Sequence, residues 1–426
     1  FLRGPGRFDA AALGRALTAV ARHHDMLRAA FPAGGDGPAV IAGPDSAAVP
    51  LDRVNVPGGD PAAVERAATE LQAAFDPARG GLFAARLFAA DDADHLLLAA
   101  HHLVVDAVSW GPILADLATA YRQAAAGEEI ALAPKTASYR DWVAALDRHA
   151  QSPELAREAA YWSRAAESAR QHRLFHRPDG PAGQDQAANL SVRAALDPER
   201  SAALAGPAPE AYSTDVLTLV LTGVARAVRS AFGVDWVPID VETHGRHELS
   251  QPIALDRTVG WFTSLHPLVA DVSGDPGDAI VRVKEALAAV PGHGVGYQLL
   301  TARGVVPAVT PGLAVNYLGA ADNAPVDGIG PSPWPVGASI SPRDRLHDPV
   351  VVDCGMAGGR AYWNITYDPS VLDQATAAFL AESIAQATAE LVDHCAGQGA
   401  RVRTASDFGG TELDGAELLE IADLLG

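Results

Sequence analysis

The chain has 426 residues, of which 48% are hydrophobic, so it can build two or three ordinary domains with large cores. Its formal net charge of -20 argues against a nucleic-acid-binding protein and against docking on anionic lipid, because both functions normally need a basic surface. No stretch is apolar over the 18 or more residues that a membrane span needs. The two cysteines, Cys354 and Cys395, have no metal-ligand spacing, and no secretion signal is visible. These features favour a soluble, cytoplasmic protein.

The first part of the chain alternates helical and extended patterns. Asp9 is a plausible cap for an amphipathic helix, because apolar side chains then recur at steps of three and four as far as Leu27. The apolar run 94–100 has the length of a strand and ends at two adjacent histidines. Ser109 predicts the cap of another helix, and further helical patterns surround Trp142 and Trp162.

The polar stretch 171–188 is rich in proline and glycine, has no periodicity and predicts a linker. Helices and strands alternate again beyond it. The helical patterns are 215–232, 278–290 and 370–395, and the strand patterns are 234–242, 312–319 and 361–368. We therefore predict an α+β protein with an N-terminal lobe at 1–175, a C-terminal lobe at 176–410 and a tail or linker at 411–426.

The stretch HHLVVDAVSW, residues 101–110, carries the first candidate site. Adjacent side chains on extended backbone point to opposite faces, so one histidine should face a core and the other something else. No third ligand stands at a recognisable spacing, so we predict no metal. One interpretation is a structural pair of histidines, with Asp106 starting a turn. The other is that His102 acts as an acid or base in a cavity, because histidine titrates near neutral pH.

Four later stretches add polar or small residues. The stretch 241–248 places Glu242, His244 and Arg246 together, either as a solvated loop or with the glutamate buried enough to act as a base. In 256–268, the adjacent Trp261 and Phe262 would normally be core residues, whereas Gly260 and Thr263 permit close backbone approach to a ligand. The glycines at 292–300 lack the strand-GxGxxG-helix context of a dinucleotide site, and an Asn-Tyr pair follows at 316–317.

Together and in this order, these stretches resemble the epimerization domain of nonribosomal peptide synthetases, a branch of the condensation-domain superfamily. HHLVVDAVSW resembles the HHxxxDG signature in the form where Ser-Trp follows. The other stretches that resemble family motifs are 211–222, 259–268, 292–300, 316–319 and 406–421. The sequence departs from the common pattern at Ala107 and Thr243, where the family has glycine, and at Leu217 and Thr218, where Asn-Asp is common. The two methyl-sized changes are tolerable where the backbone φ is negative.

The resemblance implies two chloramphenicol-acetyltransferase-like lobes in a V, with His102 on the floor of a tunnel between them. An upstream peptidyl carrier protein would deliver an aminoacyl or peptidyl group on its phosphopantetheine arm, beside neighbouring synthetase modules. The implied reaction is epimerization at the α-carbon, without an intrinsic cofactor, metal, nucleic acid or membrane. The rivals are a peptide-bond-forming condensation domain and an inactive docking platform.

The resemblance also assigns roles to residues. Glu242 would be one acid/base and His102 the other or the donor to the enolate, with the order of their roles left open. Asn316 and Tyr317 are candidates for polar contacts to the oxyanion or to the residue that transfers protons. Arg246 keeps Glu242 ionised, and Asp106 is structural, paired with Arg257. The remaining motif residues are His101, Ser109, Trp110 and His244, and the predicted tunnel residues are Gly260, Trp261, Phe262, Thr263, Ser264, Gly296 and Tyr297.

Overall fold

A computed structural model describes residues 1–4, 6–32, 39–177, 188–249, 251–320, 329–341 and 344–408. It divides into two compact units, each assembled from three segments. The first unit comprises Phe1–His149, Glu248–Thr263 and Asn323–Ser341, and the second comprises Ala150–His247, Ser264–Asp322 and Pro342–Gly426. The predicted lobes, 1–175 and 176–410, follow continuous ranges instead. The predicted tail, 411–426, lies outside the described residues, as do residues 178–187 of the predicted linker.

The first unit is built on a five-stranded sheet with the strand order β11-β1-β6-β5-β4. Strands β5 and β6 form an antiparallel hairpin, whereas β4 and β5 run parallel. A separate two-stranded ribbon pairs β2 with β3. The strands are β1 (Leu2–Arg3), β2 (Ala29–Ala30), β3 (Val40–Ile41), β4 (Leu51–Asn55), β5 (Phe83–Ala89), β6 (Asp94–Ala100) and β11 (Gly330–Pro331).

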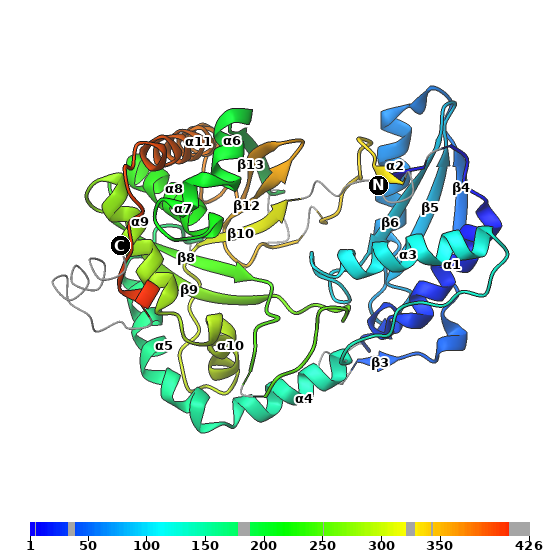
Figure 1. The fold of residues 1–426 in the computed structure, drawn as a ribbon, viewed down its shortest axis with the longest axis horizontal. Coiled ribbons are helices and arrows are strands. Elements are labelled where there is room, and N and C mark those ends of the chain that lie inside the picture. Colours follow the sequence, from blue (N-terminus) through cyan, green and yellow to red (C-terminus); the bar gives the residue numbers. More distant parts are fainter. Residues whose placement is uncertain are drawn as a thin grey trace. The chain divides into compact units, whose positions relative to one another are not determined.

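Helices cover both faces of this sheet (Figure 1). The alternation of side chains along β5 sends Leu87 into a core shared with α1 (Ala10–His23) and α3 (Trp110–Ala125). Its neighbour Phe88 packs in a second core with α2 (Pro61–Ala73). Both core-facing sides of the hairpin are therefore apolar, as expected for a sheet buried on two faces.

Helix α1 begins as predicted, because the Asp9 carboxylate accepts hydrogen bonds from the backbone N–H groups of residues 11 and 12. It ends at His23, earlier than the predicted pattern that runs to Leu27. His24 is extended, with φ -95° and ψ 107°, and a 3-10 turn follows at Asp25–Arg28. The turn keeps Leu27 buried, so the apolar periodicity continues past the true helix end.

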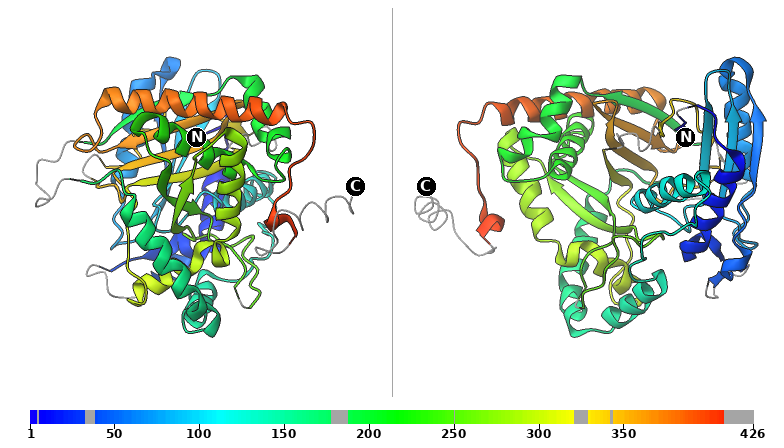
Figure 2. Two further views of the ribbon diagram at one scale, coloured as in Figure 1. Left: turned by 90° about the vertical axis from the view of Figure 1, so that its left-hand side faces the viewer. Right: turned by 45° about the vertical axis from the view of Figure 1, so that its right-hand side comes forward.

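The second unit contains a six-stranded sheet with the order β7-β13-β12-β10-β8-β9. Helices α8, α9 and α11 cover one face of it and share its large apolar core (Figure 2). The strands are β7 (Leu190–Ala195), β8 (Trp236–Thr243), β9 (Ser264–Asp271), β10 (Leu313–Ala320), β12 (Val350–Ala357) and β13 (Arg360–Tyr367). The helices are α5 (Pro153–Gln171), α6 (Pro198–Ala205), α7 (Pro207–Glu210), α8 (Val216–Phe232), α9 (Pro276–Ala288), α10 (Val295–Ala302) and α11 (Gln374–Ala396); α4 (Tyr139–Ala150) lies mainly in the first unit.

Alternation along these strands separates an apolar face from a polar one. On β13, Trp363 and Ile365 are buried in the core, whereas Asn364 is only half-buried on the other face. The cross-strand register places Asp353 beside Asn364 and extends the same face across the sheet. The predicted catalytic residues of the second unit come from this polar side, with the exception of Tyr317. None of the helices in the described ranges is long and apolar enough to cross a bilayer.

Candidate functional site

The histidine motif occupies the turn that follows β6. The backbone N–H of His101 bonds to the carbonyl of Leu82, and its Nδ1 accepts a hydrogen bond from the N–H of Leu103 at 3.2 Å. The proton of a neutral His101 ring is therefore on Nε2. Burial lowers the pKa of His101, and His102 lowers it further. His102 is exposed, and its ring lies edge-on to Trp261 with 5.1 Å between the ring centroids.

Asp106 links this turn to the segment 258–263 by a hydrogen bond. The carboxylate is 4% exposed and accepts hydrogen bonds from the backbone N–H of Ser109 at 2.8 Å and of Phe262 at 3.1 Å. Amide donors aimed at a buried carboxylate stabilise its charged form. The contacts of Asp106 are those of a structural residue that joins two distant parts of the first unit.

Ser109 stands at the N-cap position of α3 but makes no capping hydrogen bond. Its Oγ lies 2.7 Å from Asp106 Oδ1 and 3.0 Å from the carbonyl oxygen of Gly260. It also accepts a hydrogen bond from the N–H of Gly260 at 3.1 Å. Ser109 therefore occupies the predicted N-cap position, but the predicted capping hydrogen bond is wrong, because its hydroxyl bonds to Asp106 and Gly260 instead. Trp110, the next residue, packs against the core of α1 and α3.

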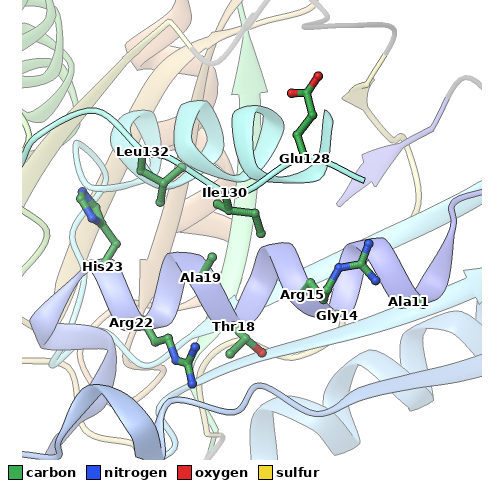
Figure 3. Close-up of a pocket in the computed structure, with 10 residues that line it drawn as sticks. All are labelled: Ala11, Gly14, Arg15, Thr18, Ala19, Arg22, His23, Glu128, Ile130 and Leu132. Carbon is green, nitrogen blue, oxygen red and sulfur yellow. The ribbon is translucent and has the colours of Figure 1, made fainter. Parts of the chain in front are cut away.

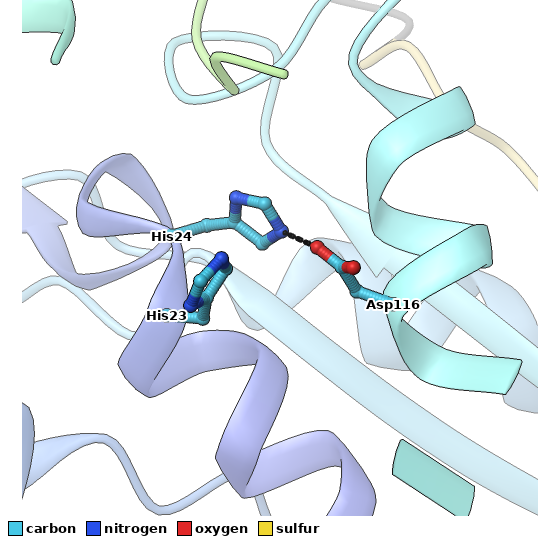
Figure 4. Close-up of side chains that lie close together, drawn as sticks. All are labelled: His23, His24 and Asp116. Carbon is cyan, nitrogen blue, oxygen red and sulfur yellow. Dashed lines mark hydrogen bonds and ion pairs between the residues drawn. The ribbon is translucent and has the colours of Figure 1, made fainter. Parts of the chain in front are cut away.

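Arg257 forms its ion pair with Asp116, so the predicted pairing with Asp106 is wrong. The guanidinium lies 2.6 Å from Asp116 Oδ1, and His24 Nε2 lies 2.9 Å from Asp116 Oδ2 (Figure 4). Burial would raise the pKa of Asp116, but the hydrogen bonds from His24 and Arg257 hold it below its ordinary value. This network ties the segment 248–263 to α1 and α3.

The residues 260–263 are held by close packing. Ideal Cβ geometry at Gly260 would bring an added methyl to 2.3 Å from Tyr139 Cδ2, so only glycine fits there. The Tyr139 hydroxyl donates a hydrogen bond to the carbonyl of Trp261 at 2.6 Å, and Phe262 is buried against Trp142. Trp261 is 42% exposed, and Thr263 is half-buried.

In the second unit, Glu242 and Asn316 are direct partners in the parallel pairing of β8 with β10. Asn316 is also the register partner of Asp353 on β12, and its Nδ2 donates a hydrogen bond to Asp353 Oδ1 at 3.3 Å. Paired residues in neighbouring strands point to the same face, so the three polar side chains form one row. Burial raises the pKa of Asp353. Sequence reasoning missed Asp353, although an acid inside the apolar run of β12 is an available signal.

Tyr317 lies on the opposite face of β10 from Asn316. Its register partner is Cys354, and its ring packs against the core under α8. Burial raises the pKa of the Tyr317 hydroxyl. The predicted pair of adjacent polar contacts is therefore split between two faces, and only Asn316 shares a face with Glu242.

The loop after β8 brings histidines together. The His244 Nδ1 accepts a hydrogen bond from the Arg246 backbone N–H at 3.0 Å. The ring of His247 lies 4.3 Å from that of His244 and 4.4 Å from that of His293, measured between centroids. Burial and the two neighbouring imidazoles lower the pKa of His247 to about 4. The sequence analysis did not single out His247 or His293, which lie more than 40 residues apart in the chain.

Other predicted tunnel residues of this unit belong to packed regions. Gly296 in α10 is pressed against α5, where an added Cβ would lie 2.3 Å from Glu158 Oε2. Tyr297 is 6% exposed, and its hydroxyl accepts a hydrogen bond from the N–H of Val309 at 2.9 Å. Ser264, the first residue of β9, is buried as well.

The departures from the family pattern fit the local structure. Ala107 and Thr243 both have negative φ, since the described non-glycine residues with positive φ are Ser213 and His293. This satisfies the condition under which their extra methyl groups are tolerated. Thr218 is buried, and its N–H and hydroxyl both bond to the capping carboxylate of Asp215 at 2.8 Å, which stabilises the start of α8.

A groove of about 900 Å³ lies beside α1 in the first unit (Figure 3). Its lining is mostly α1 side chains and the segment 128–132, and it includes Arg15, Arg22 and Glu128. None of the predicted catalytic or tunnel residues lines it. The groove therefore does not identify the site of a reaction.

The comparisons with known proteins identify the family. Residues 1–413 match the Condensation domain family. Surfactin synthase subunit 1 of Bacillus subtilis (strain 168) is 32% identical over 436 residues, which cover 98% of this chain and 12% of the relative. Tyrocidine synthase 2 of Brevibacillus parabrevis is 32% identical over 364 residues, with 83% and 10% covered. The chain belongs to the condensation-domain family and spans about a tenth of the length of these relatives.

Solved structures of the same family have a similar fold. The epimerization domain from the third module of tyrocidine synthetase B has a TM-score of 0.83 and 29% identity, over 92% of this chain and 90% of that one. The first condensation domain of the calcium-dependent antibiotic synthetase has a TM-score of 0.71 at 21% identity, over 93% and 91%. These similarities confirm the predicted α+β fold of two chloramphenicol-acetyltransferase-like lobes.

Proposed function

We propose that this protein epimerizes the α-carbon of an aminoacyl or peptidyl thioester carried by a peptidyl carrier protein of a nonribosomal peptide synthetase. The observation that carries the proposal is the register pairing of Glu242 with Asn316, which sets a carboxylate beside an amide on one face of the sheet. The likeness to the epimerization domain of tyrocidine synthetase B, at 29% identity over nine-tenths of both chains, supports the same reaction.

The chemistry removes and returns one proton. A base takes the α-proton, the electron pair of that C–H bond moves into the thioester carbonyl as an enolate, and the thioester bond stays intact. A proton then returns to the other face of the planar carbon while the carbonyl re-forms. The enolate needs hydrogen-bond donors where its charge develops.

We assign one acid/base to Glu242 and the other to His102, which can also serve as the donor to the enolate oxygen. His102 is exposed, and imidazole is a common general acid or base in proteins. Asn316 supplies an amide beside Glu242, and Asp353 orients that amide through its 3.3 Å contact. We keep Arg246 as the residue that favours the ionised form of Glu242.

The substrate arrives on the phosphopantetheine arm of an upstream carrier domain, and neighbouring synthetase modules complete the assembly in the cytoplasm. We propose that the reaction uses no intrinsic cofactor. The matched relatives are long synthases of which this chain covers a small share, which suits one domain within such an assembly.

Condensation is the second candidate, because the family match itself carries that description. It would use the same fold to join two carrier-bound substrates through a peptide bond. The two functions differ in their products, since epimerization inverts one carrier-bound residue and condensation lengthens the chain.

The test uses an excised carrier protein loaded with an L-aminoacyl or peptidyl thioester. The protein is added in D2O, and the released acid is analysed for chirality and for deuterium at Cα. We expect D-isomer that carries deuterium, and loss of both in His102→Ala. A dipeptide formed with a second loaded carrier would support condensation instead. Absence of exchange, inversion and dipeptide over several cognate substrates would support the docking platform.

A further inference from the structure

Two buried aspartates of the second unit lie close together. Asp240 lies on β8 and Asp348 lies two residues before the start of β12, and each is 1% exposed. Asp348 Oδ1 accepts a hydrogen bond from the N–H of Gly312 at 2.7 Å, whereas its buried Oδ2 accepts from no N–H or hydroxyl donor among the described residues and has the Asp240 carboxyl as its neighbour. Two adjacent carboxylates in a dry interior either share a proton, so that only one negative charge remains, or both stay ionised around a bound cation.

An imidazole completes this cluster. His347 Nε2 lies 4.0 Å from Asp240 Oδ2. One oxygen of each carboxylate and one ring nitrogen of His347 all lie within 4.8 Å of one another. The His347 side chain is 66% exposed, so the cluster has a side that is open to solvent through which an ion can enter.

A second cluster with similar spacing differs in how its carboxylate charge is balanced. His23, His24 and Asp116 in the first unit also bring three ligand atoms within 4.8 Å. There, however, the two Asp116 oxygens are held by His24 and by the guanidinium of Arg257 at 2.9 and 2.6 Å. A fixed positive charge already balances that carboxylate. No arginine or lysine forms an ion pair with Asp240 or Asp348 within the part of the chain that the structure describes, and the charge of Arg173 acts on Asp348 only from beyond ion-pair distance.

We propose that Asp240, His347 and Asp348 bind a divalent first-row transition-metal ion. Two carboxylate oxygens and one imidazole nitrogen suit Zn²⁺ or Mn²⁺, with water completing the coordination, whereas Mg²⁺ and Ca²⁺ prefer an all-oxygen set. The ion would balance the buried charge and join β8 to the segment before β12. Through the contact of Asp348 with Gly312 it would also fix the start of β10.

The site is independent of the proposed reaction. Asp240 precedes Glu242 by two residues on the same strand, so the ion would stiffen the strands that carry Glu242 and Asn316 without touching the substrate. Failure of the epimerization proposal would leave the metal site intact, and loss of the ion would leave the assignment of Glu242 intact.

The experiment titrates Zn²⁺ into the chelator-treated full chain by calorimetry and follows the melting temperature in parallel. We expect saturable binding of one ion with a rise in the melting temperature. Asp348→Asn should abolish this binding while the chain stays folded, because the amide can still accept from Gly312 and can donate to Asp240. His347→Ala should weaken binding about tenfold or more, because even outer-shell changes at metal sites have such effects.

His176→Ala is the matched control, since His176 is another exposed histidine of the same unit. It should bind Zn²⁺ as the unmodified chain does. No binding to the unmodified chain would mean that the two carboxyls share a proton, and this would overturn the proposal. Binding kept in Asp348→Asn but lost in His23→Ala would assign the ion to the other cluster, with the same consequence.

Discussion

The Asp106 carboxylate accepts a hydrogen bond from the backbone N–H of Phe262, a residue 156 positions further along the chain. This bond joins the histidine turn to the segment that carries Trp261, whose ring lies 5.1 Å from that of His102. The surroundings of His102 therefore depend on the hydrogen bonds of Asp106.

Asp106→Ala should lower the free energy of unfolding by about 3 kcal/mol, because it removes the buried carboxylate that accepts hydrogen bonds from the N–H groups of Ser109 and Phe262. Urea unfolding followed by tryptophan fluorescence measures the change. Asp92→Ala is the control, since its carboxylate is exposed and pairs with the exposed Arg3. Equal unfolding midpoints for the two variants would remove the structural role from Asp106.

Arg257 and Asp116 should be strongly coupled. Removal of one partner leaves the other charge largely buried, which typically costs ~3 kcal/mol. A double-mutant cycle with Arg257→Met and Asp116→Asn should therefore give a coupling energy of at least ~1.5 kcal/mol. Additive effects would mean that the 2.6 Å pair contributes little to holding the segment 248–263.

Gly260→Ala should destabilise the first unit, because the new methyl would lie 2.3 Å from Tyr139 Cδ2 and must displace that ring. We expect a fall in the melting temperature of several degrees by calorimetry. Gly111→Ala in α3 has open space around the added Cβ and should be neutral or slightly stabilising. A Gly260→Ala protein as stable as Gly111→Ala would contradict the packing described for this segment.

His266 should make stability dependent on pH. The ring is 2% exposed, and burial lowers its pKa from 6.5 to about 4. The unfolded chain therefore binds more protons between these values, so the stability present above the unfolded pKa is lost as the pH falls towards the folded one. The full shift corresponds to roughly 3 kcal/mol. Urea unfolding at several pH values should show that the free energy of unfolding falls less between pH ~7.5 and ~4 for His266→Gln than for the unmodified chain. Equal falls in the two proteins would show that His266 is not buried as a neutral ring.

Periodicity predicted most helices and strands, because the apolar faces that it detects are the faces that become buried. Helix α8 and strand β6 follow the predicted ranges closely. The end of α1 was missed because His24 leaves the helix to bond with Asp116, a residue 92 positions away. Local patterns carry no information about such a partner.

The sequence predicted only part of the candidate site, because local patterns do not reveal partners that are distant in the chain. The motif order singled out Glu242 and Asn316, which the structure pairs in register. The partner of Arg257 and the use of the Ser109 hydroxyl depend on tertiary contacts that no local spacing encodes. The discontinuous units also depend on tertiary contacts. The segment 248–263 belongs to the first unit because it forms hydrogen bonds with residues far earlier in the chain.

In the proposed reaction Glu242 moves the α-proton, and deuterium exchange at Cα measures this step. The measurement is the rate of deuterium incorporation at Cα of a carrier-bound thioester in D2O, for Glu242→Gln and for the exposed control Glu199→Gln. Loss of a general base typically slows a reaction ~100-fold or more, so we expect that loss in Glu242→Gln and an unchanged rate in the control. A rate for Glu242→Gln within about twofold of the unmodified chain would contradict the account, since a general base cannot be removed at so small a cost.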